Sequence, residues 1–198
     1  MEIKILGDYI HTRKLGLNLE KMRASSEKMY NLVKEKFGKD QEHNGQSTLS
    51  TELYAKYNLL MYPFEEFHEL YTAIRETFHH IDVSDDTHYI QCWLNYYQKG
   101  TFIDWHGHWP PEQRGWHGFY CVDCEPSKTT YKLPRNENRK NIIVDVPSIN
   151  DQLVISKSDG DQHRTWPWEH DDRPRITIAF DIMPREFAQP GFNHWLPL

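Results

Sequence analysis

The chain of 198 residues is long enough for one domain with its own hydrophobic core. Hydrophobic residues make up 38% and charged residues 26%, which excludes a disordered chain. The net charge of −6 disfavours a nucleic-acid partner, and no apolar run approaches the roughly 18 residues that span a membrane.

The cysteines and the N-terminal residues indicate a compartment. Three cysteines are an odd number, which fits a reducing environment better than a framework of disulfides. The first residues, MEIKILGDYIHTRK, lack the positive-then-apolar pattern of a secretory signal. We therefore expect a cytoplasmic protein without a membrane segment.

Two segments of the first half have apolar residues at helical spacing. The first begins after Asn18, a suitable N-cap, and continues to Phe37, where Gly38 suits the end of a helix. The second runs from Pro63, which suits a first helical turn, to Ile81. Both apolar stripes are expected to face a core.

From residue 88 the sequence changes to short β-rich runs separated by Gly, Pro, Asn and Asp. These runs are 88–97, 118–124, 129–133, 141–147, 152–157 and 175–182. Short antiparallel strands of this kind predict a jelly-roll or barrel, mostly β with flanking α. We expect a single domain, with a mainly helical support region over 1–85, a β core over 86–185 and an irregular tail over 186–198.

The segment DWHGHWPP places two histidines two residues apart. In a strand, alternate side chains point the same way, so His106 and His108 could reach one point, and Asp104 shares their parity. Imidazole is a good ligand for Fe, Zn, Cu or Ni, and two such ligands form half of a metal site. The other half has to come from elsewhere in the chain.

The downstream sequence supplies candidates for a third metal ligand and for an anion site. His163 follows the apolar run 152–157, at the start of a loop or a new strand. In RITIAFDI, Arg175 and Thr177 share one face with Ala179, whereas the isoleucines share the other. An arginine on the enclosed face is costly unless it binds an anion, and a guanidinium with a hydroxyl suits a carboxylate.

These residues resemble a known family. The resemblance rests on an ordered series, followed by His163 and Arg-x-Thr: Trp93, Asn95, Gly100, Trp105, His106 and His108. Over residues 88–183 the chain is similar to the 2-oxoglutarate/Fe(II)-dependent oxygenases, specifically the small oxygenases with a Trp-His-x-His segment.

The resemblance implies a double-stranded β-helix, a jelly-roll, whose mouth holds Fe(II). His106 and His163 would be iron ligands. The residues implied for 2-oxoglutarate are Arg175 and Thr177, with Asn95 and Tyr97 as further contacts. The implied reaction consumes O₂ and couples the oxidative decarboxylation of 2-oxoglutarate to hydroxylation of a substrate.

The sequence departs from the family at one ligand, because His108 stands where a carboxylate is usual. Three interpretations stay open. In the first, His108 completes a three-histidine site. In the second, Asp104 or Asp161 supplies the carboxylate instead, and in the third the position is left to water or an anion. A three-histidine site carries one negative charge fewer than the usual triad.

Two other functions stay open at this point. One is a cupin-like dioxygenase with three histidines that needs no 2-oxoglutarate, although it would have no use for Arg175. The other is a non-catalytic metal-binding β-barrel. For an oxygenase we expect a small molecule or a peptidyl residue as substrate, and the first 85 residues either cover the barrel or form a homodimer surface.

Overall fold

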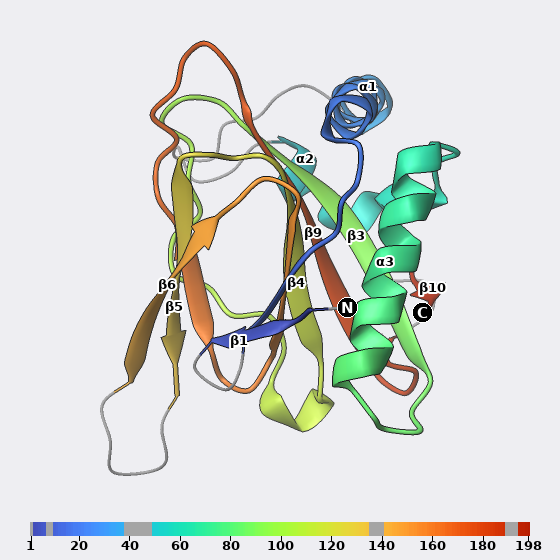
Figure 1. Ribbon diagram of the computed structural model, residues 1–198. Coiled ribbons are helices and arrows are strands. Elements are labelled where there is room, and N and C mark those ends of the chain that lie inside the picture. The colour runs from blue at the N-terminus through green and yellow to red at the C-terminus, as the bar shows by residue number, and fades with distance from the viewer. Residues whose placement is uncertain (1, 7–9, 38–48, 135–140, 189–193) are drawn as a thin grey trace.

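The computed structural model describes residues 2–6, 10–37, 49–134, 141–188 and 194–198. Its strands form two antiparallel sheets, and helices lie beside the larger sheet (Figure 1). This confirms the expected class, mostly β with N-terminal helices, and the double-stranded β-helix. No helix in the described ranges is long and apolar enough to cross a membrane.

The larger sheet has seven strands. Their spatial order is β1 (Lys4–Leu6), β2 (Ile10–Lys14), β7 (Gln152–Lys157), β4 (Trp116–Asp123), β9 (Arg175–Pro184), β3 (His88–Tyr97) and β10 (Leu196–Pro197). The smaller sheet has the order β6 (Ile142–Ser148), β5 (Ser127–Leu133) and β8 (Gln162–Thr165). β9 lies between β3 and β4, so the strand that carries Arg175 is central.

The two long helices are close to the predicted ranges. α1 spans Leu19–Phe37, and the amide of Lys21 donates to the side chain of Asn18 at 3.1 Å, as expected of an N-cap. α3 spans Glu65–Ile81. Its predicted start at Pro63 is wrong, because the Phe64 amide bonds back to the Tyr62 carbonyl at 2.8 Å and Phe64 keeps an extended backbone.

The shorter helices connect the main elements. α2 spans Leu49–Glu52, and three 3₁₀ turns span Tyr54–Lys56, Leu59–Met61 and Pro111–Gln113. The strands β1, β2 and β10 were not predicted from the sequence, whereas β8 is the strand of the two possibilities, a loop or a new strand, left open at His163. Part of the expected irregular tail, residues 189–193, lies outside the described residues.

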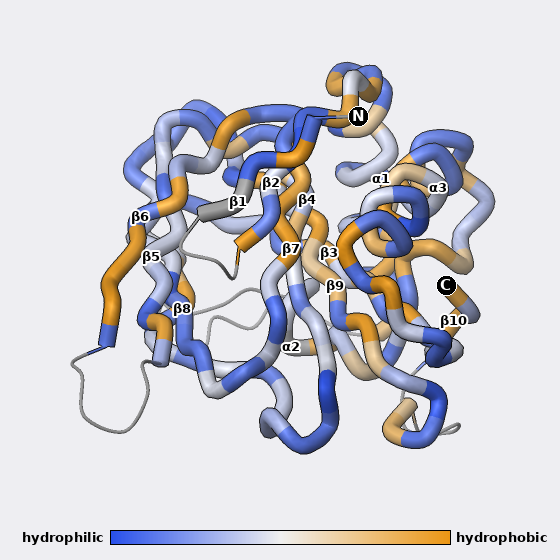
Figure 2. Tube along the Cα trace, turned by 60° about the horizontal axis from the view of Figure 1, so that its bottom comes forward, coloured by the Kyte–Doolittle hydropathy of each residue, from blue (hydrophilic) through white to orange (hydrophobic). Residues whose placement is uncertain are grey.

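Alternate side chains of β9 face opposite sides, one set toward the hydrophobic core and the other toward a cavity. Ile176, Ile178, Phe180 and Ile182 belong to the hydrophobic core together with buried residues of α1 and α3. Figure 2 shows apolar residues along β4 in the middle of the molecule, with mixed hydrophilic and apolar residues on the two helices. The opposite face of β9 lines a cavity.

Gly118 on β4 allows Phe180 to lie against the sheet. A Cβ atom at position 118 would stand 2.5 Å from Cζ of Phe180 and 2.2 Å from the Val154 carbonyl oxygen. Only glycine leaves this space. The packing fixes β4 against β9, directly beside the cavity.

Candidate metal and co-substrate site

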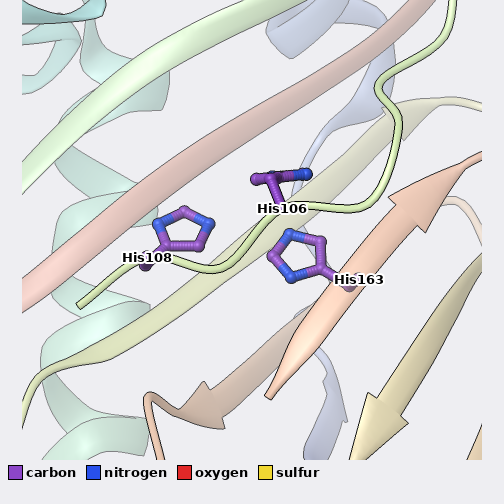
Figure 3. Close-up of side chains that lie close together, drawn as sticks. All are labelled: His106, His108 and His163. Carbon is purple, nitrogen blue, oxygen red and sulfur yellow. The ribbon is translucent and has the colours of Figure 1, made fainter. Parts of the chain in front are cut away.

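Three histidines from two separate segments meet in the cavity. His106 and His108 lie on the loop after β3, and His163 lies on β8 (Figure 3). His106 and His163 exchange backbone hydrogen bonds of 3.1 and 2.9 Å, which fixes their distance. One ligand nitrogen from each ring lies within 4.8 Å of the others.

The prediction that His106 and His108 share a strand is wrong. His106 forms a single isolated β-bridge, and the chain bends at Trp105 and Trp109. Pro110 and Pro111 follow, and a proline has no amide hydrogen with which to extend a ladder. The rings nevertheless converge, with centroids 5.5 Å apart.

Buried surroundings keep two of these imidazoles neutral. Burial, helped by the nearby His108, lowers the pKa of His106 to about 4, and burial takes the pKa of His163 well below its usual value. Nδ1 of His106 donates to the Asp104 carbonyl at 2.8 Å, which leaves Nε2 with a free lone pair. Nδ1 of His163 is buried and has no hydrogen-bond partner within the described ranges.

His108 differs from the other two histidines, because its ring hydrogen-bonds to a carboxylate. Its Nδ1 lies 2.6 Å from an oxygen of Asp181 on β9, and both side chains are largely buried. Burial lowers the pKa of His108, but the charge and hydrogen bond of Asp181 outweigh it, so the pKa is raised overall. A carboxylate accepts only, so Nδ1 donates and Nε2 is the nitrogen that remains for a ligand.

A second group of possible ligands shares His163. It consists of His117 on β4, Asp161 and His163, all buried. Nε2 of His117 lies 2.9 Å from the Asp161 carboxylate, so these two side chains already hydrogen-bond to each other. His117 does not line the cavity, whereas all three residues of the first group do.

The cavity has a volume of about 470 Å³ and extends along β9. Arg175 lines it and is 2% exposed. Among the described residues no carboxylate forms an ion pair with Arg175, its Nε has no hydrogen-bond partner, and its guanidinium lies 5.8 Å from the ring centre of Tyr97. A buried cation without a counter-ion indicates a site for an anion.

Polar side chains beside Arg175 are linked to one another. Asn95 donates to the Thr177 hydroxyl at 3.2 Å, and Thr51 on α2 donates to the Asn95 amide oxygen at 2.8 Å. All three line the cavity. Tyr97 is fully buried behind Arg175 and does not line it. The structure thus brings Asn95 and Thr177 to the cavity and places Tyr97 beneath the guanidinium.

The two alternative carboxylates lie elsewhere. Asp104 is exposed, and its side chain accepts from the Trp105 amide at 2.8 Å. Neither group of clustered ligands in the described ranges contains it. Asp161 lies in the second group, against His117.

Two of the cavity residues that sequence reasoning missed make hydrogen bonds to the candidate site residues. Asp181 shares the parity of Arg175, Thr177 and Ala179 on β9, so the alternation offered a signal for it. Thr51 lies on a four-residue helix after a polar stretch, and nothing in its local sequence marked it.

Comparisons with solved structures identify the fold. No protein-family model matches the chain, and no curated protein sequence does. A prolyl hydroxylase from Trichoplax adhaerens, solved with a hypoxia-inducible-factor peptide fragment, matches 91% of this chain and 86% of its own at a TM-score of 0.64 and 12% identity. A prolyl-4-hydroxylase from Pseudomonas putida matches 89% of this chain and 85% of its own at a TM-score of 0.58 and 12% identity.

A third match has another chemistry. The non-haem α-ketoglutarate-dependent epimerase SnoN, from nogalamycin biosynthesis, matches 96% of this chain and 87% of its own at a TM-score of 0.62 and 13% identity. A structure of SnoN holds Fe³⁺, α-ketoglutarate (2-oxoglutarate) and nogalamycin RO. This chain has the fold of the 2-oxoglutarate/Fe(II)-dependent oxygenases. At 12–13% sequence identity, the structural similarity establishes the fold alone.

The residues of this chain fit the two groups that such oxygenases use. Iron accepts imidazole ligands, and metal–imidazole bonds of about 2.1 Å would bring three nitrogens to about 3–4 Å from one another, close to the clustering of His106, His108 and His163. The unpaired Nδ1 of His163 is consistent with a missing partner. Arg175 fits a carboxylate, because a guanidinium can donate two parallel hydrogen bonds.

Proposed function

We propose that the protein is a non-haem Fe(II) oxygenase that couples the oxidative decarboxylation of 2-oxoglutarate to hydroxylation of a substrate. One observation carries the proposal: a buried arginine, without a counter-ion in the part of the chain that the structure describes, lines the same cavity as three clustered histidines. A metal-binding barrel alone would need the histidines and would gain nothing from the arginine.

Arg175 is assigned to the carboxylate of 2-oxoglutarate that lies farthest from the metal. Burial raises the electrostatic cost of an unpaired guanidinium, so a bound carboxylate recovers that cost. The Thr177 hydroxyl stands two residues along the same face of β9 and donates a further hydrogen bond. Asn95 and Thr51 orient that hydroxyl through their hydrogen bonds.

His106, His108 and His163 are assigned to the metal. The backbone bridge between His106 and His163 sets the spacing of two ligands, and Asp104 and Asp181 set the tautomers of His106 and His108. When bound, Fe(II) provides the centre at which O₂ is reduced by 2-oxoglutarate and the substrate is oxidised.

The remaining cavity walls protect the site. Trp93 on β3 and Phe119 on β4 line the cavity on either side of β9. Each is the residue directly opposite Ala179 where its strand pairs with β9. Their rings cover the space between the histidines and Arg175 with apolar surface. Excluding water strengthens every charged contact in the site.

A dioxygenase that needs no 2-oxoglutarate, and a metal bound at the second group of ligands, both account for less of the site. A three-histidine dioxygenase without 2-oxoglutarate leaves Arg175 buried without an anion. A metal group built on His117 and Asp161 has the usual carboxylate, but neither His117 nor Asp161 lines the cavity that a co-substrate would enter.

The substrate class that we propose is a small molecule or a residue of a peptide. The structural matches include enzymes of both kinds, a prolyl hydroxylase solved with a peptide and an epimerase solved with nogalamycin RO. The cavity of about 470 Å³ has room for 2-oxoglutarate and a side-chain-sized group beside it.

Calorimetric titration of the Mn(II)-loaded protein with 2-oxoglutarate tests the co-substrate site. Arg175→Gln should weaken 2-oxoglutarate binding about 100-fold or more, because two charge-assisted hydrogen bonds are lost, while Mn(II) affinity is kept. Arg164→Gln is the matched control, since Arg164 lies on β8 between the Trp105 and Trp166 rings, outside the cavity. Equal 2-oxoglutarate affinity in wild type and Arg175→Gln would refute the assignment.

A further inference from the structure

The cavity contains a buried carboxylate that the proposed ligand set does not use. Asp181 is 4% exposed and lines the cavity from β9, six residues after Arg175. Within the described residues its only ion-pair partner is His108, at 2.6 Å. It belongs to neither cluster of potential ligands among the described residues.

The ligand set explains why a carboxylate is useful there. Three neutral imidazoles leave the full charge of a divalent ion uncompensated, whereas two imidazoles and one carboxylate remove one unit of it. In this chain the carboxylate is missing from position 108 and is found one hydrogen bond away, on the far nitrogen of the histidine that replaces it.

We infer, on the basis of the proposed function, that Asp181 is a positioning residue that returns this missing negative charge to the metal through His108. A carboxylate that accepts from Nδ1 makes the opposite nitrogen a stronger donor and holds the ring in one orientation and tautomer. The site would then behave as a carboxylate-containing triad, although all three atoms on the metal are nitrogens.

The position of Asp181 in the sheet supports this role. β9 is paired on both sides, with Gln91 of β3 and His117 of β4 opposite Asp181. A residue on a central strand is held rigidly, whereas His108 lies on a loop without a ladder of its own. Asp181 therefore connects the loop ligand to the strand that also carries Arg175, and fixes the distance between metal and co-substrate.

Co(II) binding, followed by its visible absorption, tests the inference without turnover. Asp181→Asn keeps the size and an acceptor oxygen but removes the charge, and should weaken Co(II) affinity about 10- to 100-fold. In a His108→Ala background the same substitution should have no further effect, because its route to the metal is gone. Asp161→Asn is the matched comparison, a buried carboxylate on His117, and should leave Co(II) affinity within about twofold of wild type.

A second measurement, the wavelength of a charge-transfer absorption, reports the electron density at the metal. In the anaerobic Fe(II) and 2-oxoglutarate complex, Asp181→Asn should shift the metal-to-ketoacid absorption to shorter wavelength, since the iron becomes poorer in electrons. A purely structural role of Asp181 would change stability and leave the band position of the folded fraction unchanged. If Asp181→Asn does not fold, proton NMR of the wild-type Zn(II) protein replaces it: a strongly downfield His108 Nδ1 proton is expected, and its absence overturns the inference.

The outcomes separate this inference from the proposed function. Wild-type protein that binds neither Co(II) nor Fe(II) overturns both. Normal binding in wild type and in Asp181→Asn, with an unshifted band, overturns the role of Asp181 alone. A loss of affinity in Asp161→Asn but not in Asp181→Asn overturns it as well, and assigns the metal to the group around His117.

Discussion

At the level of single residues, the site is defined by buried polar atoms that have no hydrogen-bond partner among the residues that the structure describes. Nδ1 of His163 and Nε of Arg175 are the two examples that matter for function. Buried polar atoms are nearly always satisfied in folded proteins, and each exception requires a reason. A metal and a carboxylate supply the reasons here.

The two overlapping ligand groups can be separated by a pair of alanine variants. His106→Ala should lower Co(II) affinity by more than about 100-fold, because a direct ligand is lost. His117→Ala should change it by only a few-fold, since His117 lies behind the site. Equilibrium titrations of both variants provide the measurement, and the reverse ranking would contradict the assignment.

Most residues of the candidate site could be predicted from the sequence, but their relations could not. The spacing of His106 and His108, and the parity of Arg175 and Thr177, are local signals. The contact of His108 with Asp181 joins residues 73 positions apart and depends on how a loop without a ladder returns to β9. No local pattern carries that information.

At the level of elements, the strands with clean alternation were predicted best. β3 and β7 have the expected bounds, because their apolar residues and flanking turn residues agree. The short strands β1 and β2 were missed, and β8 was left open as a loop or a strand, since three to five residues are too few for a periodic signal. The loop at His106 was predicted as a strand because its parity suited a metal site, while its prolines opposed a ladder.

The close contact of β4 and β9 provides a test of this packing. Gly118→Ala should destabilise the protein by about 1–3 kcal/mol or more, because the added methyl group meets Phe180 and the Val154 carbonyl. Urea unfolding should show a lower midpoint with an unchanged slope. An unchanged midpoint would mean that β4 and β9 separate more easily than the structure indicates.

The junction of α3 and β3 should make stability depend on pH. Burial lowers the pKa of His88, although Asp82 at 3.4 Å and the Asp86 carbonyl raise it in part; Arg114 adds a small lowering. The folded pKa is below the unfolded one, so this stability is present above about pH 6.5 and is lost as pH falls.

His88→Gln isolates this contribution. Between pH 7 and 5 the wild-type free energy of unfolding should fall more steeply than that of the variant, by less than the ~1.4 kcal/mol per pH unit that one proton can give. Urea titrations at each pH measure the difference. Parallel curves for the two proteins would contradict the buried, neutral state of His88.

At the level of the whole molecule, the site joins parts that are far apart in the sequence. The metal ligands connect the loop after β3 to β8 of the smaller sheet, while Arg175 and Asp181 belong to the centre of the larger sheet. Ligands that bind only the folded chain should therefore stabilise the entire domain.

Thermal unfolding with and without metal measures this coupling. Co(II) at 100 times its dissociation constant should add about 2.7 kcal/mol to the free energy of unfolding, which corresponds to roughly 5–10 °C in Tm for a domain of this size. His106→Ala at the same Co(II) concentration should show little increase. An equal rise in both proteins would indicate binding at other surface groups.

The most direct test of the account is an anaerobic titration of metal-free protein with Fe(II) and then with 2-oxoglutarate, followed by visible absorption. We expect a charge-transfer band that needs both additions, remains in His117→Ala, and is strongly reduced in Arg175→Gln and His106→Ala. Iron binding without any band on addition of 2-oxoglutarate would contradict the central claim, that the three histidines and Arg175 form one site for a metal and its co-substrate.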